Sequence, residues 1–241
     1  MKSWFESWFN TPYYHTLYKN RNQVEANDFM KRLAKRFSFN SDQYMLDLAC
    51  GKGRHAIYLN SLGYRVDGAD LSVESIASAM EMRNKRLHFY VHDMRDELPR
   101  SYDVILNLFT SFGYFEVESE NVAVLTAIKK SLTDDGLCII DFLNLDFVKK
   151  HMIPYEVKSI DGIDFHISKK ISNTHILKNI EFEADGEKHQ YQEKVQALSF
   201  NHFQQLADKA GLKIQYAYGD YELQSYLPSQ SDRLILALTH K

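Results

Sequence analysis

The sequence predicts an α/β protein built on a mainly parallel sheet, with a stretch of antiparallel strands inserted into it. Two observations predict this. Between residues 44 and 144, short apolar runs alternate with amphipathic segments, a pattern typical of strand–helix–strand units. Between residues 155 and 199, apolar and polar residues alternate along runs that turn residues separate, which is typical of an antiparallel meander. The 241 residues are enough to bury a hydrophobic core.

The first 20 residues form an aromatic segment, which Thr11-Pro12 interrupts. A helix is expected after it, because apolar residues from Ala26 to Phe37 recur at helical spacing. We therefore expect residues 1–40 to form an N-terminal segment that ends in a helix. The aromatic residues of its first part are Trp4, Phe5, Trp8, Phe9, Tyr13, Tyr14 and Tyr18.

The alternating region is expected to contribute five strands and three helices to the sheet. Ser72 can cap the second helix, and Gly136 follows the third. Strands that alternate with helices imply parallel pairing. The expected strands are 44–48, 64–69, 87–92, 102–108 and 137–142, and the expected helices are 51–62, 73–86 and 121–132.

The antiparallel stretch interrupts this alternation. Its turns are expected at Asp161-Gly162 and at Ala184-Asp185-Gly186. A helix closed by Gly211 and two further strands then resume the α/β pattern. We expect residues 145–199 to be a β-rich insertion, serving as a lid or for dimerisation. The core would consist of residues 41–144 and 200–241, with the last helix at 203–210 and the last strands at 212–218 and 233–239.

Composition excludes several classes of partner. The 29 Lys+Arg against 32 Asp+Glu give a net charge of −3, which argues against a partner held by phosphate neutralisation, such as nucleic acid. Cys50 and Cys138 supply neither a disulfide framework nor a four-ligand zinc site, so no metal is expected. No apolar run approaches the roughly 20 residues of a membrane span. A soluble, cytoplasmic protein is expected.

A glycine loop lies between the first expected strand and the first expected helix. The stretch from Asp47 to His55 is DLACGKGRH. Its glycines allow a ligand to approach the backbone closely, and the helix start offers free N–H donors. The stretch GKGRHA also satisfies the dinucleotide pattern G-x-G-x-x-A, a match that is weak by itself.

Three acidic residues are expected at the same edge of the sheet as this loop. Asp47, Asp70 and Asp93 follow one another at intervals of 23 residues, at the ends of three expected strands. Asp70 is suited to accept hydrogen bonds from a ribose diol, and Asp93 from the amine of an adenine. Asp47 would repel a pyrophosphate but attract an ammonium or a sulfonium. S-adenosylmethionine carries both cations, a ribose and an adenine.

The sequence resembles the class I S-adenosylmethionine-dependent methyltransferases of the bacterial small-molecule type. The stretch DLACGKGRH is similar to their first motif, GADLS around Asp70 to the second, HDMR around Asp93 to the third, and DVILNL from Asp103 to the fourth. The resemblance covers residues 40–145 and, more loosely, the last two strands. It implies a Rossmann-like seven-stranded sheet of order 3-2-1-4-5-7-6, with the last strand antiparallel and the insertion after strand five.

The resemblance also implies an activity and a set of cofactor-binding residues. The enzyme would transfer a methyl group from S-adenosylmethionine to a small-molecule acceptor and leave S-adenosylhomocysteine. Asp47 would lie near the cofactor ammonium, Asp70 would bind the ribose hydroxyls, and Leu71 would pack on the adenine. The residues expected at the cofactor are Tyr14, Tyr18, Asp47, Ala49, Gly51, Gly53, Asp70, Leu71, Asp93, Met94 and Leu108.

Aromatic residues after the fourth expected strand are candidates for the substrate pocket. The stretch from Leu108 to Phe115 is LFTSFGYF. It is similar to one in bacterial small-molecule methyltransferases that also share the aromatic pattern of residues 8–18. Ring faces attract a sulfonium by about 0.5–2 kcal/mol and exclude water from the transfer centre. We expect Phe112 and Tyr114 to face the pocket.

Methyl transfer from a sulfonium needs neither a metal nor a covalent intermediate, because the methyl carbon is already activated. A base is needed only where the acceptor must lose a proton. Candidates for that base are Tyr14, His15, Tyr114 and His151, each with a structural role as the alternative.

Two other functions stay open. An NAD(P)-dependent oxidoreductase fits the glycine pattern, although Asp47 weighs against it. A non-catalytic S-adenosylmethionine-binding protein fits equally well, because no single catalytic residue is obligatory for methyl transfer. A homodimer through the insertion is also open.

Overall fold

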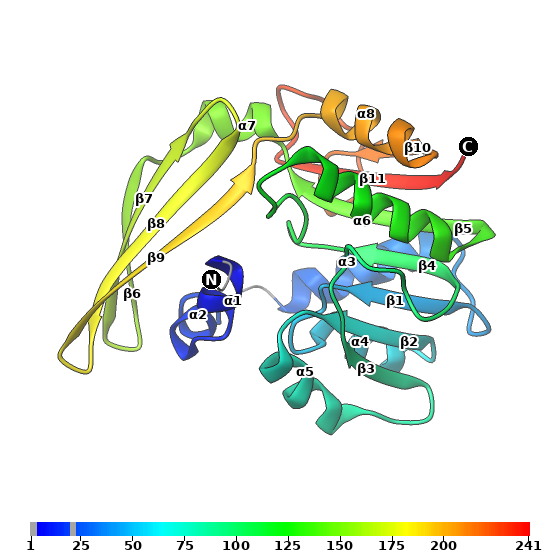
Figure 1. Ribbon diagram of the computed structural model, residues 1–241, viewed down its shortest axis with the longest axis horizontal. Helices are drawn as coiled ribbons and strands as arrows, with labels where there is room; N and C mark the ends of the chain where they lie inside the picture. Colours follow the sequence, from blue (N-terminus) through cyan, green and yellow to red (C-terminus); the bar gives the residue numbers. More distant parts are fainter. Residues whose placement is uncertain (1–3, 20–22) are drawn as a thin grey trace.

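The computed structural model describes residues 4–19 and 23–241 and contains two β-sheets. The larger sheet has seven strands and the smaller has four. In Figure 1 the two sheets are set apart, with two short N-terminal helices between them. Residues 1–3 and 20–22 of the expected N-terminal segment lie outside the described residues.

The larger sheet confirms the predicted fold. Its order is β3-β2-β1-β4-β5-β11-β10, which is the expected 3-2-1-4-5-7-6 when β10 and β11 count as strands six and seven. β11 pairs antiparallel with both neighbours, and β1 to β5 pair in parallel. The strands are β1 (Tyr44–Leu48), β2 (Arg65–Asp70), β3 (Leu87–Val91), β4 (Tyr102–Asn107), β5 (Leu132–Leu143), β10 (Leu212–Tyr218) and β11 (Arg233–His240).

Helices cover both faces of this sheet (Figure 1). Because successive strand side chains point to opposite faces, Leu46 and Leu48 of β1 join the core beneath α6 and α8, and Met45 joins the core beneath α3, α4 and α5. These helices are α3 (Gln23–Arg36), α4 (Arg54–Ser61), α5 (Val73–Ala79), α6 (Glu118–Ser131) and α8 (Phe200–Ala210).

The smaller sheet is an antiparallel meander in the order β6-β7-β8-β9, as the alternating pattern predicted. Its tight turns fall at Asp161-Gly162 and Asp185-Gly186, where all four residues have positive φ. A helix that was not predicted, α7 (Leu145–His151), precedes it, and the Asn144 side chain caps that helix. The strands are β6 (Tyr155–Ile160), β7 (Ile163–Ile171), β8 (His175–Ala184) and β9 (Glu187–Gln196).

The N-terminal aromatic segment forms two helices, α1 (Trp4–Phe9) and α2 (Pro12–Leu17). Thr11 separates them, and its side chain accepts a hydrogen bond from the Tyr14 N–H at 3.1 Å. One cluster buries Trp8 and Leu17 against the smaller sheet. The aromatic segment therefore packs mainly on the smaller sheet, through Phe165, Ile167, Ile180 and Phe182.

The second core helix is shorter than predicted. α5 ends at Ala79, and a single 3₁₀ turn (Met80–Met82) follows it, whereas the sequence pattern predicted helix to residue 86. Asn84 explains the difference, because its side chain accepts the Arg86 N–H and its backbone pairs with Leu87. Such local bonds compete with helical ones.

Within residues 4–19 and 23–241, no helix combines the length and the apolar character needed to cross a membrane.

Candidate active site

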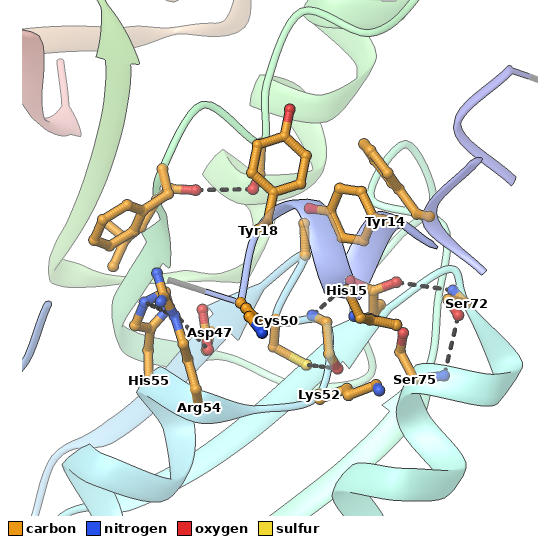
Figure 2. Close-up of a pocket in the computed structure, with 18 of the residues that line it drawn as sticks. Tyr14, His15, Tyr18, Asp47, Cys50, Lys52, Arg54, His55, Ser72 and Ser75 are labelled. Carbon is orange, nitrogen blue, oxygen red and sulfur yellow. Dashed lines mark hydrogen bonds and ion pairs between the residues drawn. The ribbon is translucent and has the colours of Figure 1, made fainter. Parts of the chain in front are cut away.

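A cavity of about 390 Å³ lies at the carboxyl ends of β1, β2 and β4, with α2 on its opposite side (Figure 2). A second cavity of about 70 Å³ adjoins it near the end of β3. The two share a wall, because the same residues line both: Phe9, Ala49, Asp70, Ser111 and Tyr114. Together they form one elongated candidate site.

The glycine loop forms the floor of the larger cavity. The N–H groups of Ala49 and Cys50 donate to the Ala69 carbonyl at 2.7 and 3.0 Å, which ties the loop to the end of β2. Gly51 has φ +55°, and a Cβ placed on it would meet no atom within 4 Å, so its backbone is open to a ligand. Gly53 differs: a Cβ there would lie 2.5 Å from the Phe89 ring.

Asp70 ends β2 at the wall between the two cavities. Its Oδ2 accepts the Gly51 N–H at 2.7 Å, and its Oδ1 accepts the Ser72 N–H at 2.8 Å. Burial raises the pKa of this carboxyl, and the backbone donors oppose that rise. The two donors fix the orientation of the carboxylate and leave each oxygen a further lone pair for a ligand.

Asp47 lies deeper, near the carboxyl end of β1, and is almost fully buried. Its Oδ2 accepts the Ala56 N–H at 3.2 Å and lies 3.9 Å from Nδ1 of His55. Burial raises the pKa of Asp47 to about 7; the charge of Asp70 adds to the rise and that of Arg54 opposes it. A cation bound beside Asp47 would stabilise its ionised form.

Arg54, His55 and Phe109 form a stack at one end of the larger cavity. The His55 and Phe109 rings are parallel within 10°, with centroids 4.8 Å apart. The Arg54 guanidinium lies 4.8 Å from the Phe109 centroid, and its Nε donates to Nε2 of His55 at 2.9 Å. Arg54 and His55 are basic residues of the glycine loop, whereas the sequence did not single out Phe109.

The smaller cavity is lined by Leu71, Asp93 and Met94, which are among the residues expected at the cofactor. Arg95 donates to both Asp93 oxygens, with Nε at 3.0 and 3.1 Å and Nη2 at 2.5 Å from Oδ2. These hydrogen bonds hold the pKa of Asp93 below its usual range. Asp93 is therefore ionised and fixed in place by its neighbour.

Aromatic rings from the N-terminal helices and from the loop after β4 form a wall of the larger cavity. Phe9 lies 4.8 Å from Tyr14 and 5.7 Å from Tyr114, and Tyr14 lies 4.9 Å from Tyr18, measured between ring centroids. Figure 2 shows Tyr14 and Tyr18 above the glycine loop. The Tyr114 hydroxyl donates to the Thr110 carbonyl at 2.5 Å.

Most of the residues expected at the site line one of these cavities. Twelve residues expected at the cofactor or as a base line a cavity: Tyr14, His15, Tyr18, Asp47, Ala49, Gly51, Asp70, Leu71, Asp93, Met94, Leu108 and Tyr114. Lining residues that the sequence did not single out include Phe5, Phe9, Lys19, Gln23, Cys50, Ser72, Ser75, Phe109 and Ser111.

Three expected residues lie elsewhere. Phe112, expected at the substrate pocket, is fully buried in the core, 5.5 Å from the ring of Phe203. Gly53 makes room for a packed ring and does not line either cavity. His151 is exposed on α7, where its ring stacks on Phe147.

Comparison with known proteins agrees with this geometry. Residues 45–136 match the family described as methyltransferase domain. The match covers less than half of the chain. The matched residues include the glycine loop, Asp70 and Asp93, which form a large part of the candidate site.

Two relatives of the methyltransferase domain are N-methyltransferases. A glycine/sarcosine N-methyltransferase of Halorhodospira halochloris is 30% identical over 138 residues, 55% of this chain and 50% of that protein. The dTDP-3-amino-3,6-dideoxy-alpha-D-glucopyranose N,N-dimethyltransferase of Streptomyces fradiae is 31% identical over 98 residues, 40% of this chain and 38% of that protein. The chain spans half or less of the length of these relatives.

Solved structures extend the similarity to the whole fold. An S-adenosylmethionine-dependent methyltransferase from Clostridium acetobutylicum has a TM-score of 0.79 at 15% identity and covers 95% of this chain and 96% of its own. An amino pentose methyltransferase from Micromonospora echinaspora, with bound S-adenosylmethionine, has a TM-score of 0.73 at 16% identity. Its alignment covers 96% of this chain and 98% of that chain. The fold of the class I S-adenosylmethionine-dependent methyltransferases is thereby confirmed.

Proposed function

We propose that this protein is an S-adenosylmethionine-dependent methyltransferase that acts on a small molecule. One observation carries the proposal. Asp70 lies on the wall between a larger cavity of mixed polarity and a smaller, mainly apolar one, with its carboxylate oriented by the Gly51 and Ser72 N–H groups. A nucleoside with a charged tail needs a ribose acceptor at such a junction. The similarity of residues 45–136 to the methyltransferase-domain family supports this.

The residues present fit that cofactor. The larger cavity is within the roughly 300–1,000 Å³ of small-molecule sites. Asp47 offers a carboxylate for the ammonium, and Arg54 lies at the cavity wall with a positive charge for the carboxylate. Leu71 and Met94 offer apolar surface for the adenine. When bound, S-adenosylmethionine supplies a methyl carbon already activated by the sulfonium.

The chain's own task is then to align the acceptor and to exclude water. We assign this to the aromatic wall of Phe9, Tyr14, Tyr18 and Tyr114, whose faces also suit a cation. In this proposal the smaller sheet, within residues 145–199, acts as the support of that wall. Tyr14, His15 and Tyr114 lie at the cavity and are the candidates for a base.

We propose an amine as the acceptor. The relatives named above are N-methyltransferases of glycine or sarcosine and of an amino sugar nucleotide. An uncharged amine can attack the methyl carbon directly, and its proton can leave afterwards to a base or to water. The net charge of −3 also favours a small acceptor over nucleic acid.

The first experiment is a thermal-shift comparison of S-adenosylhomocysteine, S-adenosylmethionine and NADH. We expect the melting temperature to rise with the first two and to stay unchanged with NADH. A rise with NADH alone would overturn the cofactor assignment in favour of an oxidoreductase.

The second experiment measures transfer of a labelled methyl group to a panel of small amines: glycine, sarcosine and an amino sugar nucleotide. The matched hydroxyl compounds serve as controls. Transfer to an amine and not to its hydroxyl counterpart supports the proposal. Cofactor binding without transfer to any compound would instead indicate a non-catalytic binding protein.

A further inference from the structure

Two consecutive residues after β4 adopt left-handed backbone conformations although neither is glycine. The φ angles are +55° at Phe109 and +62° at Thr110. Such conformations are unfavourable for residues with a Cβ, and more so for β-branched threonine, and they persist only where the surrounding structure holds them. The contacts that hold these two residues therefore bear on the function of the loop.

A buried ion pair holds both residues. Oδ2 of Asp141, on β5, accepts the Phe109 N–H at 2.8 Å, and the carbonyl of Asp141 accepts the Thr110 N–H at 2.9 Å. Arg233, on β11, donates from Nε to Oδ1 of Asp141 at 2.8 Å and from Nη2 to the Thr110 hydroxyl at 3.1 Å. Asp141 is fully buried, and the Arg233 side chain is 17% exposed.

A tyrosine completes the support. The Tyr221 hydroxyl donates to Oδ2 of Asp141 at 3.3 Å, and its ring lies 5.3 Å from the ring of Phe109. The Arg233 guanidinium lies 5.5 Å from the same Tyr221 ring. Neither Asp141 nor Arg233 is among the residues that line the two cavities. Any effect of the pair on the site must therefore pass through the loop.

The loop sets the orientation of two cavity residues. The Phe109 ring stacks on His55 beneath the Arg54 guanidinium. The Thr110 carbonyl receives the Tyr114 hydroxyl at 2.5 Å, and the Tyr114 ring lies between the two cavities. A rotation of the backbone at Phe109 or Thr110 would thus move both rings. Asp70 and the backbone from Ala49 to Gly51 have their own hydrogen bonds and do not depend on this ion pair, whereas Arg54 and His55 contact the Phe109 ring.

We propose that Asp141 and Arg233 are a positioning pair that holds the acceptor side of the cavity in its working shape. The identity of the bound acceptor rests on the proposed function. The support of the loop by Asp141 and Arg233 does not depend on it. If the pair is loosened, Tyr114 and Phe109 are less firmly positioned, while Asp70 and the backbone from Ala49 to Gly51 keep their hydrogen bonds. The expected signature is a larger change in the KM for the acceptor than in cofactor affinity.

The main test is Thr110→Gly in the full chain, with Ser38→Gly as the matched control. Glycine adopts positive φ without strain, so neither change introduces backbone strain. Thr110→Gly also removes the hydroxyl that Arg233 contacts. Ser38 has φ +54° in the turn after α3 and does not line either cavity.

We expect Thr110→Gly to speed amide hydrogen exchange in residues 108–115 and to raise the acceptor KM by about tenfold. The Kd for S-adenosylhomocysteine should change less than the acceptor KM, and Ser38→Gly should match the wild type in every measurement. Arg233→Lys keeps the charge but lacks the planar fork, so it should reproduce the exchange and KM changes.

Wild-type exchange rates at residues 108–115 in Thr110→Gly overturn the positioning role, whatever the behaviour of Arg233→Lys. Faster exchange with an unchanged acceptor KM also overturns it, because the loop would then be held for stability alone. If the wild type methylates no acceptor, the proposed function fails, and the exchange measurement alone decides whether the pair holds the loop.

Discussion

The hydroxyl of Tyr18 donates a hydrogen bond of 2.6 Å to Oε1 of Glu193, which lies on β9 of the smaller sheet. The same oxygen accepts the Trp8 indole N–H at 2.9 Å, and Lys178 lies 3.3 Å from the other oxygen. Tyr18 lines the larger cavity, whereas no described residue of β6–β9 does. The smaller sheet therefore reaches the site through the N-terminal helices that it carries.

Replacing Glu193 with alanine should separate the N-terminal helices from the smaller sheet. It leaves the Trp8 and Tyr18 donors without their acceptor and removes the carboxylate partner of the largely buried Lys178 ammonium, which keeps the Tyr18 hydroxyl as an acceptor; each unsatisfied group costs about 1–3 kcal/mol. We expect urea unfolding to show a loss of at least about 2 kcal/mol. The control is Glu183→Ala, an exposed position on β8. Equal stability of the two variants would contradict the structural link.

Asp70→Ala should weaken cofactor binding. Hydrogen bonds to a charged group contribute about 1.5–3 kcal/mol, so we expect the Kd for S-adenosylhomocysteine to rise by roughly tenfold to a hundredfold. Calorimetry measures the change. Glu74→Ala, an exposed position in the first turn of α5, should bind as the wild type does. An unchanged Kd in Asp70→Ala would remove the proposed ribose contact.

Cofactor binding should depend on pH through Asp47. Its pKa is raised to about 7 by burial, so the carboxyl is protonated below that pH and ionised above it. If the cofactor ammonium binds the ionised form, affinity falls as the pH drops below 7, by up to about tenfold per pH unit, and levels off above 7.

The measurement is the Kd for S-adenosylhomocysteine between pH 5.5 and 8.5, about 1.5 units on either side of that pKa. Asp47→Asn should bind weakly at pH 8 and lose this dependence. Any slope that persists in Asp47→Asn belongs to neighbouring titratable groups such as His55 and Asp70. The same slope in both proteins would show that Asp47 does not face the ammonium.

Truncation of Phe112 should mainly lower stability, and truncation of Phe109 should mainly raise the acceptor KM. Phe112 is fully buried beside Phe203, so Phe112→Ala should cost about 3–5 kcal/mol of stability while folded enzyme keeps its acceptor KM. Phe109 is only partly buried and lines the cavity, so Phe109→Ala should lose less stability and raise that KM. Urea unfolding and steady-state kinetics together distinguish the two. A raised acceptor KM in Phe112→Ala, with an unchanged acceptor KM in Phe109→Ala, would instead indicate that Phe112 lines the pocket.

The sequence predicted the sheet and its functional edge because both depend on local periodicity. Apolar runs that end in Asp47, Asp70 and Asp93 identify strand ends, and the geometry of parallel strands brings these ends to one edge. The prediction was wrong where local competition or packing decides the outcome. Asn84 ends α5 early through its own hydrogen bonds, and the role of Gly53 follows from the Phe89 ring that packs against it.

The loop after β4 marks the limit of prediction most clearly. Its aromatic residues were expected at the pocket, but alternation along a strand cannot be extended through Phe109 and Thr110, whose positive φ angles redirect the chain. That backbone conformation depends on Asp141 and Arg233, which are 32 and 123 positions away from the residues they hold. No pattern within the loop itself contains this information.

The sequence by itself determined the α/β architecture, the strand order through its family resemblance, and the acidic residues at the carboxyl edge. These follow from hydrophobic periodicity and from short motifs, which are properties of neighbouring residues. Only the tertiary structure decided which aromatic rings face the cavity and what supports them. That support comes from hydrogen bonds and ion pairs between distant segments, such as Tyr18 with Glu193 and Thr110 with Arg233, and it exists only once the chain has folded.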